Sequence, residues 1–310
     1  MTQPRPKCTI HDHHFGWDNS LPPTLEVDPG EVVEFEVLDS SGGQFTHAST
    51  SEHVGVLDFA KINPVTGPVL VRGAEPGDAL TVDILEFRPS GFGWTAAIPG
   101  FGLLTEDFPE PYLKLWHYGE QTAEFLPGIE IPVRPFPGTI GNAPAESGHF
   151  SVVPPRAVGG NMDIRDLTAG STLYLPVAVP GALFSVGDTH AAQGDGEVCG
   201  TAVESAMHVT LRFGLKKAAN LPTPRFSTSG PVTSHIDRQG YEVTTGIGPD
   251  LFAAARDATR FMVDFMTGEY DLSPQDAYLL CSVAADLRVS EIVDAPNWLV
   301  SLYLPKSIFK

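Results

Sequence analysis

The sequence predicts a β-rich α+β protein, with a β-sandwich or barrel-like core of many short strands and two late helices. Its 31 glycines and 28 prolines are spread along 310 residues, as expected for turns between short strands. Segments that alternate polar and apolar residues occur early, whereas helical periodicity appears only near the end. We expect one domain over residues 1–310, β-rich over about 1–248 and helical over about 249–290.

Four segments are predicted as strands because their residues suit a half-buried or buried sheet. The clearest is Glu31–Leu38, in which charged and apolar residues alternate, and the others are Val69–Arg72, Ala79–Leu85 and Thr172–Val179. Proline-glycine turns precede two of them. Residues 88–150 have weak periodicity, so we expect long ordered loops there. Their aromatic residues would wall a pocket, form a subunit contact or pack the loops, and they include Phe92, Trp94, Phe101, Phe108, Tyr112 and Trp116.

Two helices are predicted after residue 249. The first covers Asp250 to Met266, where apolar residues recur on one stripe at helical spacing. The second begins at Ser273, a favourable N-cap that is followed by Pro274 at the first helical position. Its expected apolar face consists of Tyr278, Leu279, Val283 and Leu287.

Composition excludes several classes of partner. Hydrophobic residues make up 42% of the chain and charged residues 18%, which is ample for a core. The net charge of −19 disfavours binding to nucleic acid or to an anionic membrane surface. The chain begins without an apolar leader and contains no long apolar run, so we expect a soluble, cytoplasmic protein. Cys8, Cys199 and Cys281 are odd in number and far apart, which is unlike a disulfide framework.

One stretch, residues 187–204 (GDTHAAQGDGEVCGTAVE), is dense in residue types that carry chemistry. We interpret it as strand, glycine turn and returning strand. Alternation along a strand places Asp188 and His190 on one face, and the turn would bring Asp195 and Glu197 to the same mouth. Glu204 has the opposite parity from Glu197, so we expect it to approach the site from a second layer or to pair with a buried arginine.

Carboxylates gathered around an imidazole suit a divalent metal, with a spare carboxylate to take a proton from water. The alternative is an acidic turn that merely solvates the hairpin. Apolar residues flank the stretch on both sides, and bare acids in a buried hairpin would be costly without a cation or hydrogen bonds. The residues alone leave both interpretations open.

Several motifs together resemble the acetamidase/formamidase family. They are GGNMDIRDL at residues 159–167, the stretch at 187–204, TGPV at 66–69, GAEPGD at 73–78, GTIG at 138–141 and SPQDAYLLCSVAADLRV at 273–289. The similarity extends over roughly residues 12–300. It implies a β-rich homo-oligomeric hydrolase that converts a small-molecule amide, formamide or acetamide, to ammonia and the carboxylate.

The leading mechanistic hypothesis is a water activated by a divalent metal, with zinc favoured. Asp188 and His190 would be ligands, and Glu197 or Asp195 would be a third ligand or the general base. His14 lies in a run that resembles the family's early His-aromatic-Gly segment, and it would complete the coordination unless it is a surface histidine. Cys199 is a rival nucleophile, although a free cysteine among apolar residues is usually inert.

The GGNMDIRDL motif supplies further candidates. Asn161 would donate to the oxyanion, and Asp163 would orient His190 or bind metal. Arg165 and Asp166 fit a structural ion pair better than a catalytic role. No G-x-S-x-G elbow, H-E-x-x-H helix or nucleotide-binding glycine loop occurs.

The competing function is a non-catalytic β module for binding or assembly, with structural calcium in the acidic hairpin. His190 argues against it, because calcium takes oxygen ligands. Within the enzyme reading, formamide and acetamide differ by one methyl group, worth only about 1–3 kcal/mol in a pocket, so the sequence does not separate them.

Overall fold

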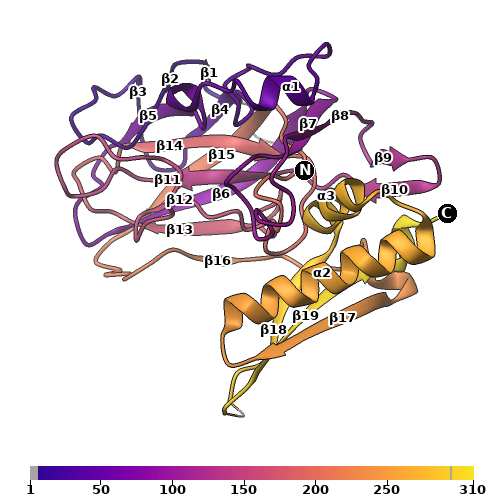
Figure 1. The fold of residues 1–310 in the computed structure, drawn as a ribbon. Helices are drawn as coiled ribbons and strands as arrows, with labels where there is room; N and C mark the ends of the chain where they lie inside the picture. Colours follow the sequence, from indigo (N-terminus) through magenta and orange to yellow (C-terminus); the bar gives the residue numbers. More distant parts are fainter. Residues whose placement is uncertain (1–5, 294) are drawn as a thin grey trace.

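Two β-sheets packed face to face form the main body of the protein, in a computed structural model that describes residues 6–293 and 295–310 (Figure 1). The first sheet has the spatial order β1 (Thr9–Ile10), β4 (Val32–Val37), β15 (Met207–Lys216), β6 (Ala79–Pro89), β13 (Thr172–Pro176) and β16 (Arg225–Ser227). The second has the order β12 (Gly159–Asn161), β11 (Phe136–Gly141), β14 (Phe184–His190), β5 (Val65–Val71) and β2 (His13–His14), with β3 (Leu25–Val27) also paired to β5.

The core of the sandwich lies between these sheets. Phe35 of β4 and Phe213 of β15 meet Phe184 of β14, with ring centroids 5.8 and 5.0 Å from the Phe184 ring. All three rings are fully buried, and their edge-to-face arrangement is favourable for aromatic pairs. The predicted β-rich sandwich is therefore confirmed, and the predicted strands lie within or overlap β4, β5, β6 and β13. Neither sheet closes into a barrel in the described part of the chain.

The expectation of long loops over residues 88–150 is wrong. Two hairpins and β11 lie there: β7 (Phe92–Ala97) with β8 (Tyr112–His117), and β9 (Thr122–Leu126) with β10 (Ile129–Pro132). Alternation failed as a guide because β7 is buried on both faces from its second residue onward. A strand that is covered on both sides has no polar face to alternate with.

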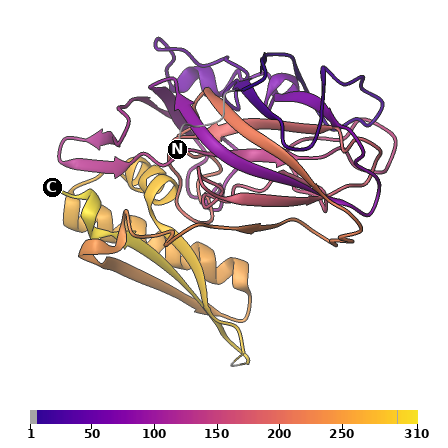
Figure 2. The same cartoon turned by 180° about the vertical axis from the view of Figure 1, so that it is seen from behind.

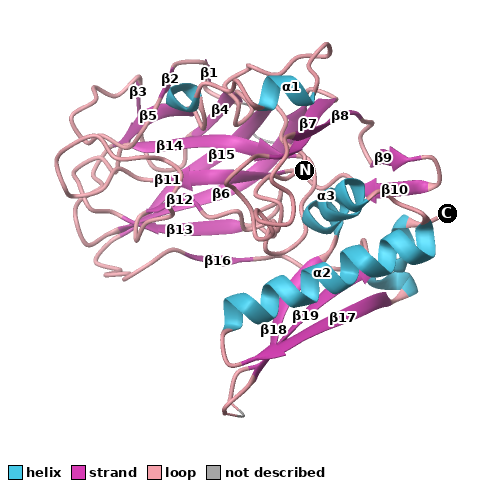
Figure 3. Cartoon of the chain, in the orientation of Figure 1, coloured by secondary structure: helices cyan, strands magenta, loops and turns pink. Residues whose placement is uncertain are grey.

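The C-terminal part forms a separate helix-and-sheet layer beside the sandwich, which Figure 2 shows from behind. Helix α2 (Leu251–Tyr270) covers a three-stranded sheet with the order β17 (Tyr241–Gly248), β19 (Trp298–Pro305) and β18 (Asp286–Glu291). Helix α3 (Pro274–Ala284) packs against α2 and lies between this layer and the sandwich (Figure 3). None of the helices in the described residues is long and apolar enough to cross a bilayer.

Both late helices begin as predicted. The carboxylate of Asp250 accepts a hydrogen bond from the Ala253 amide at the start of α2, and the Ser273 hydroxyl accepts one from the Asp276 amide at α3. Caps of this kind stabilise a helix by about 1 kcal/mol each. Leu287 was expected on the second helix but lies in β18, because α3 ends at Ala284. The three strands of this layer were not predicted.

Candidate functional site

A buried carboxylate–imidazole cluster lies at the end of β14. The Nε2 atom of His190 is 3.1 Å from Oδ1 of Asp188 and 3.2 Å from Oε2 of Glu204. All three side chains are buried. As predicted, Asp188 and His190 lie on the same side of their strand. Ligand atoms about 2.0–2.1 Å from a tetrahedral metal are separated by similar distances, so this spacing also suits a shared cation.

Glu204 joins the cluster because the chain does not form the expected hairpin. After β14 it runs through turns over residues 191–206, and single bridges join Glu204 to His190 and to Trp94. The returning strand is absent from this described stretch, so strand parity does not apply to Glu204, which contacts His190 directly and does not pair with an arginine. Its carboxylate accepts hydrogen bonds from the Ser40 hydroxyl at 2.7 Å and the Ala202 amide at 2.7 Å.

A second group shares the same histidine. One ligand atom each from Asp163, His190 and Glu197 can be placed within 4.8 Å of one another. Oδ1 of Asp163 is buried and has no hydrogen-bond partner. Among the carboxylates of the cluster, Asp163, Asp188 and Glu197 have left-handed backbones, with φ of 50°, 52° and 43°. Such a conformation costs about 1–2 kcal/mol per residue. The backbone that directs these side chains toward the cluster therefore lowers the stability of the folded protein.

The carboxyl groups of the cluster repel one another in a dry environment. Burial and the nearby Asp188 raise the pKa of Asp163 to about 7. Burial and Asp163 raise the pKa of Glu197 well above its usual range, and burial also raises the pKa of Glu204. Burial alone would lower the pKa of His190, but the carboxylates of Glu204 and Asp188 raise it well above its ordinary value. One imidazolium cannot neutralise four carboxylates.

These residues fit a divalent cation. An excess of buried carboxylate charge and the unpartnered Oδ1 of Asp163 are the features that a bound cation would satisfy. The imidazole nitrogen is a ligand that zinc accepts, whereas calcium sites use oxygen ligands throughout.

A cavity of about 90 Å³ leads from the surface to the cluster. Asn161, Asp188, Glu197 and Glu204 line its polar floor, and its walls include Trp94 and Phe101. The Asn161 side-chain oxygen accepts a hydrogen bond from the Thr139 hydroxyl, and its amide nitrogen donates to the carbonyl of Val153. An amide nitrogen carries two hydrogens, so one is left for a ligand.

Two predicted site residues lie apart from the cluster. His14 is in β2, where Nε2 contacts the Ser185 hydroxyl at 3.0 Å and Nδ1 contacts the Gly16 carbonyl at 2.9 Å, and it belongs to neither ligand group. Asp195 contacts Nε of Arg165 at 3.2 Å, and its side chain is 46% exposed. We expected Asp195 to lie at the same mouth as His190. It does not, because the turn holds Asp195 against Arg165.

Arg165 and Asp166 form ion pairs outside the cluster, although they do not pair with each other as expected. Arg165 forms a two-pronged ion pair with the fully buried Asp286, including an Nη2–Oδ2 contact of 2.9 Å. Asp166 lies 3.5 Å from Arg134. Because Asp286 begins β18, the first of these pairs ties the loop that carries Asp163 to the C-terminal layer.

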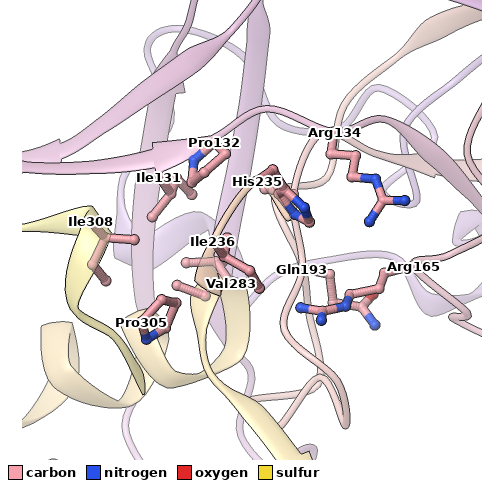
Figure 4. A pocket seen from close by; sticks show the side chains of 12 residues that line it. Ile131, Pro132, Arg134, Arg165, Gln193, His235, Ile236, Val283, Pro305 and Ile308 are labelled. Carbon is pink, nitrogen blue, oxygen red and sulfur yellow. The ribbon is translucent and has the colours of Figure 1, made fainter. Parts of the chain in front are cut away.

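Gln193 is a site residue that the sequence analysis missed. Its Oε1 lies 2.9 Å from Nδ1 of His190, and its Nε2 donates to the main-chain oxygen of Asp163 at 2.9 Å. The only hint in the sequence was a polar side chain three residues after His190 inside the dense motif. Gln193 also lines a separate cavity of about 20 Å³, room for about one water (Figure 4). Figure 4 shows Gln193 and Arg165 at one end of that cavity and Ile308 at the other.

Cys199 lies in a turn rather than in a strand. Its sulfur is within 3.6 Å of the Ala96 carbonyl and 3.4 Å of the Thr201 hydroxyl, and the side chain is fully buried. Burial raises the pKa of this thiol to about 11. Since the thiolate is the nucleophilic form, this environment is typical of an inert cysteine.

The protein is a β-sandwich with a buried carboxylate–imidazole centre that opens into a small cavity, as expected for a site that acts on small molecules. Comparisons with known proteins identify the family. The chain belongs to the Acetamidase/Formamidase family, whose model matches residues 4–149 and 145–310. A formamidase from Methylophilus methylotrophus is 29% identical over 367 residues, with 96% of this chain and 89% of that protein covered.

Solved structures give the same relationship. A gamma lactamase from Delftia acidovorans has a TM-score of 0.91 at 26% identity, with 98% of this chain and 93% of that chain covered. An acetamidase from Bacillus halodurans has a TM-score of 0.69 at 34% identity, with 96% and 97% covered. The resemblance inferred from the motifs is thus confirmed.

Proposed function

We propose that this protein hydrolyses short aliphatic amides to ammonia and the corresponding carboxylate at the cluster around His190. The observation that carries the proposal is the geometry of His190, held between Asp188 and Glu204 at the floor of a cavity with Glu197 beside it. Family membership and relatives that are named formamidase and acetamidase support the same reaction.

The cation in this proposal is zinc, held by Asp188, His190 and Glu204. When bound, such an ion polarises the amide carbonyl and lowers the pKa of a water molecule to about 7. Zinc is favoured over calcium because a nitrogen ligand lies at the centre of the cluster. A non-catalytic module with structural calcium is therefore the weaker alternative, and the named amidases among the relatives do not favour it.

Glu197 is the proposed general base. It lines the cavity, belongs to the second ligand group and has a raised pKa, which makes its carboxylate a stronger base than an ordinary one. Its carboxylate takes a proton from the attacking water and returns it to the leaving nitrogen. Asp163, whose pKa is raised to about 7 by burial and by Asp188, carries less negative charge beside Glu197 than an ordinary carboxylate would. Asn161 offers its spare amide hydrogen to the oxygen of the tetrahedral intermediate.

A cyclic amide is the second candidate substrate. The similarity to the gamma lactamase structure, with its TM-score of 0.91, favours including a lactam among the compounds tested. Homo-oligomeric assembly and a cytoplasmic location are further parts of the proposal, and they rest on the family resemblance and the composition.

Ammonia release from formamide and acetamide, measured with and without a strong chelator, tests the proposal. We expect release that the chelator abolishes and that zinc restores. In Glu197→Gln, we expect kcat to fall by about 10²–10⁴-fold with metal content unchanged. Glu120→Gln, an exposed position with the same chemical change, is the matched control and should retain full activity. Release that survives chelation but is lost on thiol alkylation would contradict the proposal.

A further inference from the structure

We infer that the apolar collar at the mouth of the cavity selects amides with a hydrocarbon acyl chain over formamide. The collar consists of Leu57, Phe59, Ile62, Ile98, Phe101 and Val153, all of which line the cavity above the polar floor. This inference rests on the proposed function, since it concerns the substrate class of the same site.

Two phenylalanines bring the sides of the collar together. Phe59 lies in η1 (Phe59–Lys61) and Phe101 in the loop between β7 and β8, yet their rings stack with centroids 5.5 Å apart and planes at 19°. Segments far apart in the sequence thus meet as one apolar surface. The contact fixes both side chains beside the cavity, where a bound acyl chain would touch them.

Part of the apolar surface of the collar is exposed and does not pack against the rest of the protein. Phe59 is 47% exposed, Phe101 40% and Val153 37%. On a protein with a net charge of −19, exposed large apolar side chains gathered around a cavity that leads to polar groups are typical of a ligand site. A hydrocarbon ligand would cover this surface, and a water molecule or formamide would not.

Polar groups near the collar are already engaged elsewhere. The Ser40 hydroxyl donates to Glu204, and the Ser41 hydroxyl donates to Asp39. The Thr201 hydroxyl donates to the Ala96 carbonyl at 2.9 Å. Asn63 adds an amide to the wall, and the remaining polar contacts for a substrate lie at the floor. An amide group would therefore bind deep, beside Asn161 and Glu197, with its acyl chain directed toward the collar.

A series of linear amides tests the inference: kcat/KM for formamide, acetamide, propionamide and butyramide with the metal-loaded enzyme. Burial of each added methylene should raise kcat/KM by about three- to fourfold. Phe59→Ala and Phe101→Ala should lower the ratio of kcat/KM for butyramide to that for formamide by about tenfold. Both residues are partly exposed, so their replacement leaves the core intact.

Phe261→Ala is the matched control, because Phe261 is 51% exposed on α2 and lies outside the cavity lining. It should leave the ratio unchanged. Values of kcat/KM that stay level or fall along the series would overturn the inference while leaving the proposed function intact. Failure to hydrolyse any amide in the series would overturn both.

Discussion

Gln193 fixes the orientation of the His190 imidazole. Because Nε2 of Gln193 donates to the Asp163 main chain, its Oε1 is the atom that faces Nδ1 of His190, 2.9 Å away. An amide oxygen only accepts hydrogen bonds, so Nδ1 carries a hydrogen and donates it. Nε2 of the ring is thereby directed at Asp188 and Glu204, where a cation would bind.

Replacement of Gln193 by leucine should weaken metal binding. Loss of the acceptor frees the ring to rotate and to change tautomer, and removal of such a partner typically reduces metal affinity by about 10–100-fold. Gln193→Glu retains an acceptor for Nδ1–H and should keep most of the affinity. Competition with a chromogenic chelator measures this directly. Equal affinities for Gln193→Leu and the exposed control Gln239→Leu would show that Gln193 does not position the ring.

Chelation should destabilise the protein more at high pH than at low pH. Without a cation, the pKa of Asp163 is about 7 in the folded chain against an ordinary 3.8, and the pKa of Glu197 is raised as well. Folded carboxyl groups with raised pKa values hold protons that the unfolded chain has released, so stability falls as the pH rises from about 4 through 7. The raised pKa of His190 acts in the same direction above pH 6.5.

A bound cation replaces those protons, so the difference in Tm between zinc-loaded and chelator-treated protein should widen from pH 5 to pH 8. Thermal unfolding at four pH values measures it. A constant or narrowing difference would mean that the cation does not bind among these carboxylates.

Cys199→Ala should leave kcat nearly unchanged. Its thiol is buried and its pKa is about 11, so the thiolate is scarce at neutral pH. Removal of a true nucleophile lowers kcat by about 10⁶-fold, which makes the distinction large. Steady-state ammonia release by the purified variant, with folding checked by thermal unfolding, is sufficient. A collapse of turnover in a folded variant would restore Cys199 as the nucleophile.

Gly138→Ala should disturb the centre without altering any of its functional groups. A Cβ atom at this position in β11 would lie 2.7 Å from both Oδ1 of Asp163 and Cε1 of His190. Displacement of reacting groups by about 1 Å lowers turnover by about 10²-fold, so we expect a loss of that order with weaker metal binding. Gly268→Ala in α2 meets no atom within 4 Å and is the control. Equal metal affinity in the two variants would contradict the packing argument.

The local features of the sequence were sufficient for the helices and for the class of fold. The caps at Asp250 and Ser273 act within one turn, so no tertiary information was needed to predict them. The strands of the first hairpin were missed because β7 is enclosed by other segments, which the sequence cannot reveal. Helix α3 was extended to Leu287 for a similar reason, since the pairing of β18 with β19 ends it.

The composition of the site was predicted better than its geometry. The motif at residues 187–204 does contain the histidine and most of the carboxylates of the cluster. The positions of Gln193, Glu197 and Glu204, however, depend on turns between residues 191 and 206, including a left-handed backbone at Glu197. Strand parity could not anticipate these turns, and it therefore left the position of Glu204 open and joined Asp195 to a group that it does not contact.

The left-handed backbone conformation of acidic residues in the cluster has a consequence for laboratory evolution of this enzyme. Asparagine or glycine at Asp163 or Glu197 would suit the positive φ and remove a buried carboxyl group whose pKa is raised, so such changes should raise heat resistance while sharply lowering turnover. A library selected only for stability at high temperature would therefore become enriched in variants with little or no activity. Any selection for thermostable variants of this chain therefore needs a second screen, for ammonia production, before variants are chosen for sequencing.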